Sequence, residues 1–248
     1  MVKIQGILSE HPDNKNYGVR RMQAALVQKG THVSLRTVYR TMSEAGLIHR
    51  RRRPHGITKA DTDTQNRENL IKRNFSADKP MKKLLTDITE VQCADGKLYI
   101  SPVLDCFNGE IVALGMRDNM KTVLYINALK QLREKYGRLG GPVLYSSRGC
   151  QYASCDFRRE LVTNGIIQSL SGTAHCYDNA RMESFFATLK KEKLYQIPTY
   201  RMKRDEVKTV NFRYIFGYYN TQRINSFNEG GLPPVALRTS KQFSHHAA

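Results

Sequence analysis

Two short helical patterns separated by a turn stand near the beginning of the chain. The spacing of apolar residues predicts a helix over residues 19–29, with Gly30 where a left-handed residue ends many helices. Ser34 is a favourable N-cap for a second helix over residues 35–45. The predicted apolar faces consist of Val19, Met22, Ala25 and Leu26 in the first helix and Leu35, Val38 and Met42 in the second. Helix, short turn and helix together form the helix-turn-helix pattern.

The second of these helices also has a polar side. On that side lie Arg36, Thr37, Tyr39 and Arg40. A run of arginines follows directly, namely Arg50, Arg51, Arg52 and Arg53. Such a helix can enter a DNA groove and such a run can contact phosphates. The pattern therefore predicts a small all-α DNA-binding module, and the alternative is a helical bundle with a solvated charged face.

From Lys83 onward the pattern is that of strands mixed with helices. Apolar or alternating runs predict strands over residues 84–91, 98–107, 111–116, 143–147 and 166–170. Helical spacing predicts helices over residues 122–136, 157–162, 179–194 and 205–219. Asp95-Gly96 and Asn108-Gly109 separate the first three strands, and both dipeptides favour hairpins. The sequence thus predicts an α/β fold with a mixed five-stranded sheet flanked by helices, in the order of a ribonuclease-H-like fold.

The segment between these two regions is polar and only weakly periodic, as in a linker. We therefore expect a helix-turn-helix module over residues 1–53 and a linker over residues 54–80. The ribonuclease-H-like core with its C-terminal helix is expected over residues 81–240, followed by a tail over residues 241–248.

Composition adds a strong positive charge to this picture. The 248 residues include 40 Lys and Arg against 22 Asp and Glu, for a formal net charge of +18 and a pI of about 9.8. Residues 1–60 alone hold 12 of these basic residues and three acidic ones, which is half of the surplus. A surplus of this size indicates a polyanionic partner, and nucleic acid is the first candidate.

The same composition argues against other classes of protein. No apolar run reaches the roughly 20 residues of a membrane span, and the start lacks the pattern of a signal peptide. We expect a cytoplasmic protein with no membrane partner, in which the five cysteines are reduced thiols. The cysteines contain no Cys-x-x-Cys pair, so a structural zinc site is not indicated.

Two acidic residues stand out by position as candidates for chemistry. Asp87 lies in the middle of the first predicted strand, where a charge is costly unless it is paired or bound to metal. Glu183 lies near the start of the helix over residues 179–194, and Lys190 follows it by seven residues. Carboxylates on a strand and a nearby helix can converge on Mg²⁺ ions that promote phosphodiester chemistry. Alternatively, Asp87 is an acid at a sheet edge and Glu183 is an exposed charge on a helix. Lys190 is a candidate for contacting a DNA phosphate, and the alternative is a solvated lysine.

A group of residues at the end of the last predicted helix allows two interpretations. The group consists of Tyr218, Tyr219, Asn220 and Arg223. Either the tyrosines pack in a core or the group contacts the substrate, and the sequence leaves both possibilities open.

The residues quoted so far belong to an ordered set of short motifs. The set includes Tyr17-Gly18-Val19-Arg20-Arg21, Val33-Ser34-Leu35-Arg36-Thr37-Val38-Tyr39-Arg40, Thr86-Asp87-Ile88-Thr89, Val103-Leu104-Asp105, Ser146-Ser147-Arg148-Gly149, Tyr177-Asp178-Asn179-Ala180-Arg181-Met182-Glu183-Ser184-Phe185-Phe186 and Tyr218-Tyr219-Asn220-Thr221-Gln222-Arg223. In this order it resembles the second-frame transposases of the insertion-sequence family called IS three, whose core is similar to retroviral integrases. The resemblance extends roughly from Asn16 to Leu237.

This resemblance implies a DDE recombinase, in which two aspartates and a glutamate hold two Mg²⁺ or Mn²⁺ ions. It assigns Asp87 as the first acid and Glu183 as the third. It also implies double-stranded DNA as partner, both as element ends and as target, and self-association on that DNA. A first-frame protein, separate or fused upstream, is a further partner that the family suggests.

The second acid of the set is missing from this chain. In the family, 35 residues separate the second aspartate from the glutamate, and the residue at that distance before Glu183 is Ser147. A serine hydroxyl is a neutral and much poorer Mg²⁺ ligand than a carboxylate. We therefore expect DNA binding with impaired catalysis. Asp105 and Asp178 are the acids that could substitute, and both are interpreted as structural.

Two other functions remain as alternatives at this stage. The first is a non-catalytic DNA-binding protein that competes for element ends, which Ser147 favours. The second is a ribonuclease-H-type nuclease, which the basic module at the front of the chain disfavours.

Overall fold

A computed structural model describes residues 1–48, 75–146, 154–170 and 179–246 of the chain. The chain divides into two compact units, one of Met1–Thr58 with Phe216–Ala248 and one of Lys59–Ile215. We call the first the two-ended unit, because it combines both ends of the chain, and the second the core unit. Arg50, Arg51, Arg52 and Arg53 and most of the predicted linker lie outside the described residues.

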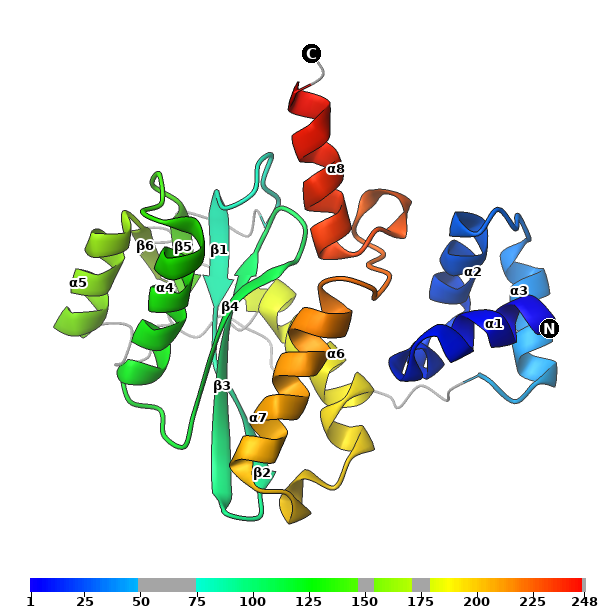
Figure 1. The fold of residues 1–248 in the computed structure, drawn as a ribbon, viewed down its shortest axis with the longest axis horizontal. Coiled ribbons are helices and arrows are strands. Elements are labelled where there is room, and N and C mark those ends of the chain that lie inside the picture. The colour runs from blue at the N-terminus through cyan, green and yellow to red at the C-terminus, as the bar shows by residue number, and fades with distance from the viewer. Residues whose placement is uncertain (49–74, 147–153, 171–178, 247–248) are drawn as a thin grey trace, which may run out of the picture. The chain divides into compact units, whose positions relative to one another are not determined.

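Six strands form one mixed sheet in the core unit (Figure 1). They are β1 (Lys83–Thr86), β2 (Thr89–Cys93), β3 (Gly96–Asp105), β4 (Ile111–Arg117), β5 (Val143–Ser146) and β6 (Ile167–Leu170). The long strand β3 pairs antiparallel with β1, β2 and β4, whereas β5 pairs parallel with β1 and β6. The predicted α/β class and mixed sheet are confirmed.

The first predicted strand, residues 84–91, is divided into β1 and β2 at Asp87. Both parts keep the same register against β3. The pairs on either side of the break are Thr86 with Val103 and Thr89 with Ile100. The predicted number of five strands is therefore wrong, since one predicted strand forms two. The physical reason is that a regular strand would bury the Asp87 carboxylate among apolar residues, which is unfavourable.

Both predicted hairpin dipeptides form turns. Gly96 opens β3 with a φ of 113° and lies opposite Cys93, so Ala94 and Asp95 form a two-residue loop. Gly109 has a φ of 78° between β3 and β4. Both backbone conformations are favourable only for glycine, which explains why these dipeptides are strong signals.

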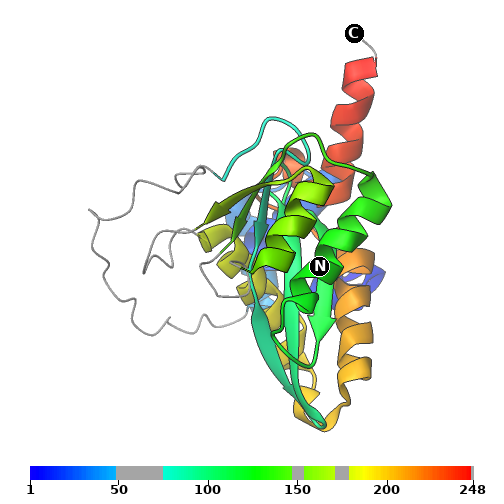
Figure 2. The same cartoon turned by 90° about the vertical axis from the view of Figure 1, so that its left-hand side faces the viewer.

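Helices cover both faces of the sheet (Figure 1). The four are α4 (Val123–Tyr136), α5 (Cys155–Asn164), α6 (Ala180–Glu192) and α7 (Arg204–Phe212). The first three agree with predicted helices to within a few residues, whereas the helix predicted over residues 205–219 consists of α7 and the π-helix that follows it. Figure 2 shows α4 and α5 in front of one face. Their apolar side chains and those of the sheet form the main core, which includes Leu84, Val103, Val112, Leu124, Leu129, Leu132, Leu144, Phe157 and Leu161. Burial of these side chains is the main source of stability of the core unit.

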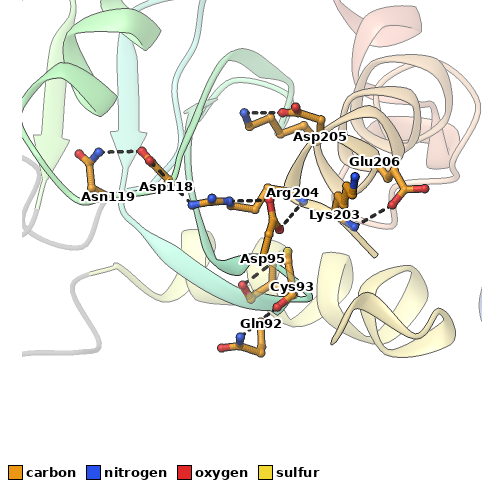
Figure 3. A network of polar contacts seen from close by, with 11 residues as sticks. Gln92, Cys93, Asp95, Asp118, Asn119, Lys203, Arg204, Asp205 and Glu206 are labelled. Atoms are coloured by element: carbon orange, nitrogen blue, oxygen red, sulfur yellow. Dashed lines mark hydrogen bonds and ion pairs between the residues drawn. The ribbon is translucent and has the colours of Figure 1, made fainter. Parts of the chain in front are cut away.

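A polar network fastens the beginning of α7 to the sheet (Figure 3). The Arg204 side chain donates to Asp95 in the β2–β3 loop at 3.1 Å, and its guanidinium lies 3.8 Å from Asp118 beyond β4. The Arg204 backbone N–H also donates to Asp95, and Ala94 N–H donates to the Met202 carbonyl. The hairpin signal at Asp95-Gly96 thus has a second role, because its carboxylate anchors a helix distant in sequence.

The two-ended unit contains the predicted helix-turn-helix segment. Its helical elements are α1 (Val2–Glu10), η1 (Pro12–Asn16), α2 (Val19–Gln28), α3 (Leu35–Glu44), η6 (Glu229–Gly231) and α8 (Pro234–His246). The Ser34 hydroxyl caps α3 by accepting from Thr37 N–H at 3.1 Å, as predicted. Leu35 is 41% exposed, so the predicted apolar face is wrong at this residue, because the packed part of α3 begins one turn later at Val38.

The sequence missed α1, η1 and α8. In α1 only Ile4 and Ile7 are buried, so the apolar stripe is too narrow to predict a helix. After α7 the chain continues as a π-helix over Arg213–Tyr219, and α8 follows through a stretch rich in asparagine and glycine. Within the described residues, no helix has the length and apolar character that crossing a membrane requires.

Replacement of Gly165 tests how the end of α5 packs against the segment that contains Leu139. It ends α5 with a φ of 68°, and a Cβ there would clash with the carbonyl oxygen of Leu139. Gly165→Ala is expected to destabilise the protein by about 3 kcal/mol or more, since left-handed strain and a backbone clash add together. Urea unfolding followed by circular dichroism measures the loss.

Gly141→Ala is the matched control, because Gly141 has a φ of 82° but open space around its Cα. It is expected to lose only the strain, about 1–2 kcal/mol. Equal losses for the two variants would contradict the packing of α5 against the segment that contains Leu139.

Candidate active site and nucleic-acid interface

Asp87 lies at the break between β1 and β2 and is half-buried. The Asn179 side chain donates from Nδ2 to Asp87 Oδ2 at 2.9 Å, and Ile88 N–H also donates to the carboxylate. Burial raises the pKa of Asp87 above its ordinary value, and these two hydrogen bonds oppose part of the rise. A carboxylate that is partly removed from water and still accessible is suited to binding a cation.

Glu183 lies in the first turn of α6, one turn after Asn179, and is exposed. Partial burial of its carboxyl raises the pKa of Glu183, and the negative charge of Asp87 raises it further. The fold therefore brings together two acids that are 96 positions apart in the sequence. Two like charges at one place repel each other, and a bound cation would relieve that repulsion.

The donor set fits one divalent cation better than two. Carboxylates are the ligands that Mg²⁺ and Mn²⁺ prefer, and Asp87 and Glu183 supply two of them. In the part of the chain that the structure describes, no group of three His, Cys, Asp or Glu side chains is arranged to hold a metal. Ser147, at the position of the second aspartate, lies outside the described residues, directly after the end of β5.

Asp105 has a structural role, as expected from the sequence. It is 1% exposed, and its two oxygens accept from the backbone N–H groups of Met81 at 2.8 Å and Phe107 at 2.9 Å. Burial raises the pKa of Asp105 to about 6, although both hydrogen bonds act the other way. Its register partner is Leu84, which faces the main core. The Asp105 carboxylate is thus buried and held by two backbone N–H groups, and Asp178 lies outside the described residues.

The exposed side of α3 is the candidate nucleic-acid interface. Its exposed residues include Arg36, Thr37, Tyr39 and Arg40. A shallow open pocket lies on this side, between Ser34 and Glu44. Lys190 lies on α6, seven residues after Glu183, and is partly exposed. These placements leave all five side chains accessible to a partner.

The tyrosines at the end of the π-helix pack inside the two-ended unit. Tyr218 is 1% exposed, and its hydroxyl donates to Asn14 Oδ1 at 2.9 Å. The ring of Tyr218 stacks on His11 with 4.2 Å between ring centroids. The Ile224 N–H donates to the Tyr17 hydroxyl at 3.3 Å. Of the two interpretations that the sequence left open, packing is therefore the one that the structure supports for Tyr218.

Sequence reasoning missed the part played by Asn179 and Arg181. Asn179 is the N-cap residue of α6 but makes no capping hydrogen bond, because its amide is directed to Asp87. Arg181 donates to the carbonyls of Phe75 at 2.6 Å and Cys106 at 2.5 Å. One signal in the sequence could have indicated the role of Asn179. It precedes Glu183 by four positions, so the two side chains lie on the same face of a helix.

Family models match three parts of the chain. Residues 77–176 match one integrase core domain model and residues 183–241 match another, while residues 1–55 match an HTH-like domain. The fold is similar to a chain in the simian T-cell lymphotropic virus intasome bound to the PP2A regulatory subunit B56 gamma. That likeness has a TM-score of 0.55 at 15% identity and covers 87% of this chain and 70% of the other. The class defined is an integrase-type core combined with a helix-turn-helix module.

Two bacterial relatives are similar in sequence to this chain over most of its length. It is 34% identical over 233 residues to the putative transposase InsK for insertion sequence element IS150 of Escherichia coli, covering 92% of this chain and 79% of InsK. It is 29% identical over 228 residues to the transposase InsF for insertion sequence IS3A of the same organism, covering 89% and 76%. The chain belongs to the IS3 family of insertion-sequence transposases.

Proposed function

We propose that this chain is a transposase subunit that binds the ends of its insertion sequence through α3, and that its strand-transfer chemistry is impaired at Ser147. The juxtaposition of Asp87 and Glu183 carries the proposal. Two acids at a strand break and on the facing helix, tied together through Asn179, are what a metal-dependent phosphodiester reaction needs. The basic helix-turn-helix segment supplies the DNA contacts.

Each candidate residue has a separate task in this proposal. Asp87 and Glu183 would hold a divalent cation, which when bound activates the attacking oxygen and stabilises the leaving one. Lys190 would contact a DNA phosphate beside that site. Ser147 would contribute a neutral hydroxyl where relatives supply a carboxylate. A loss of about 4 kcal/mol in transition-state stabilisation lowers a rate about a thousandfold, which is the scale expected for one missing ligand.

A non-catalytic role is the second candidate function, and Ser147 is the observation that favours it. A chain that retains the DNA-binding segment but lacks one acid would occupy element ends without cutting them. Self-association on DNA and a first-frame protein remain proposals under either role. The two roles differ in a single measurable property, namely residual metal-dependent cleavage by the unmodified chain.

DNA binding through α3 is tested by charge removal. Replacing both Arg36 and Arg40 with alanine is expected to weaken binding to an element-end duplex about 100-fold, because each arginine contributes about 1–3 kcal/mol in a base or phosphate contact. The slope of log affinity against log salt concentration is expected to fall by about two if both contact phosphates. Fluorescence anisotropy over a range of salt concentrations measures both quantities.

The matched control removes the same charge from the core unit. Lys130 and Arg133 are both exposed on α4, and alanine at both is expected to change affinity less than threefold beyond the general effect of net charge. If the α4 pair weakens binding as much as the α3 pair, α3 is not the DNA-binding face.

A further inference from the structure

Asn179 stands out because it gives up its ordinary role. It occupies the N-cap position of α6, where an asparagine side chain normally accepts from a backbone N–H of the first turn. Here it makes no such bond and donates instead to Asp87 Oδ2 at 2.9 Å. The side chain is 8% exposed, and its Oδ1 atom is buried with no hydrogen-bond partner within the described residues. The capping hydrogen bond that asparagine normally makes is therefore absent at the position next to the proposed metal site, and such exceptions to local preference are typical of functional sites.

From this we infer that Asn179 is a positioning residue for the metal site, acting through Asp87. The inference rests on the proposed function, because it takes Asp87 and Glu183 as the metal ligands. The hydrogen bond to Oδ2 restricts rotation of the Asp87 carboxylate, so that the carboxylate would meet a cation in one orientation. Removal of a group that hydrogen-bonds to a metal ligand commonly changes metal affinity 10- to 100-fold.

Asn179 also affects the position of Glu183, the second proposed ligand. Asn179 precedes Glu183 by one helical turn, so the bond to Asp87 ties the beginning of α6 to the interrupted strand. Arg181 adds a second tie through the Cys106 carbonyl at the end of β3. Asn179 therefore restrains the first turn of α6, which contains Glu183, relative to Asp87, and one side chain acts on both proposed ligands.

The experiment measures Mn²⁺ binding to the full chain by electron paramagnetic resonance, which detects free Mn²⁺ and needs no catalysis. Asn179→Ala is expected to weaken Mn²⁺ affinity 10- to 100-fold. Asn179→Leu fills the same space without a polar group and is expected to do the same, which covers the case in which the alanine variant does not fold. Circular dichroism melting confirms that each variant is folded.

Control variants separate the inference from the function on which it rests. Ser184→Ala changes an exposed neighbour of Glu183 and is expected to leave affinity within twofold. Asp87→Asn and Glu183→Gln are expected to weaken binding at least tenfold. In an Asp87→Ala background, which removes both the ligand and the acceptor of the Asn179 hydrogen bond, adding Asn179→Ala is expected to change the remaining affinity less than twofold.

Two results would overturn the inference in distinguishable ways. If the Asp87 and Glu183 variants weaken binding while folded Asn179 variants stay within twofold of the unmodified chain, the metal site stands and the role of Asn179 is wrong. If neither Asp87→Asn nor Glu183→Gln changes Mn²⁺ affinity, the proposed metal site fails and the role of Asn179 fails with it.

Discussion

Ser147→Asp is expected to raise the rate of element-end cleavage and joining by about a thousandfold or more, since it supplies the carboxylate that the proposed site lacks as a second metal ligand. The reason is electrostatic. Asp87 and Glu183 offer two negative charges, which match one divalent cation, and serine adds none, whereas a third carboxylate would favour a second cation. The measurement is strand cleavage and joining on an element-end duplex, in Mg²⁺ and then in Mn²⁺.

The design of this experiment distinguishes three explanations. The Ser147→Asp chain combined with Glu183→Gln is expected to lose the gained activity, which ties the gain to the metal site. If the unmodified chain cuts as well as the Asp variant, a ligand other than residue 147 completes the site. If neither chain cuts while both bind the duplex, the non-catalytic role or a requirement for a first-frame protein explains the result.

Much of the fold could be predicted because its local signals are strong and agree with one another. Ser34 and Gly30 mark helix ends by short-range chemistry that acts wherever the helix lies, and both were correctly placed. Asp95-Gly96 fixed a hairpin for the same reason. In contrast, the division of the first strand at Asp87 depends on the surroundings of that carboxylate in the folded chain. Its side-chain partner, Asn179, is almost a hundred positions away in the sequence, so no local pattern indicates the division.

The candidate site was only partly visible in the sequence for a related reason. Asp87 and Glu183 are charged residues within apolar patterns, which makes them conspicuous from the sequence alone. Asn179 is a common N-cap residue, and an N-cap asparagine carries no sign that its amide is used elsewhere. The packing of Tyr218 against Asn14 was equally hidden, because apolar periodicity reports that a side chain is buried but not its partner.

The packing of Tyr218 implies that the DNA-binding segment depends on the C-terminal part of the chain. Tyr218→Ala is expected to destabilise the two-ended unit by about 3–5 kcal/mol, the usual loss for removing a buried aromatic ring. Native-state hydrogen exchange is the appropriate measurement, because it reports each unit separately. Exchange at amides of α2 and α3 is expected to accelerate at least a hundredfold, while amides of β3 and β4 keep their rates.

The conservative variant divides this effect into its parts. Tyr218→Phe keeps the ring stacked on His11 but leaves the buried Asn14 Oδ1 without its donor, and about 1–2 kcal/mol is expected to be lost. Phe227→Ala serves as the control, because that side chain is 82% exposed in the same unit. Faster exchange in β3 and β4 with unchanged α2 and α3 would contradict the assignment of Tyr218 to the two-ended unit.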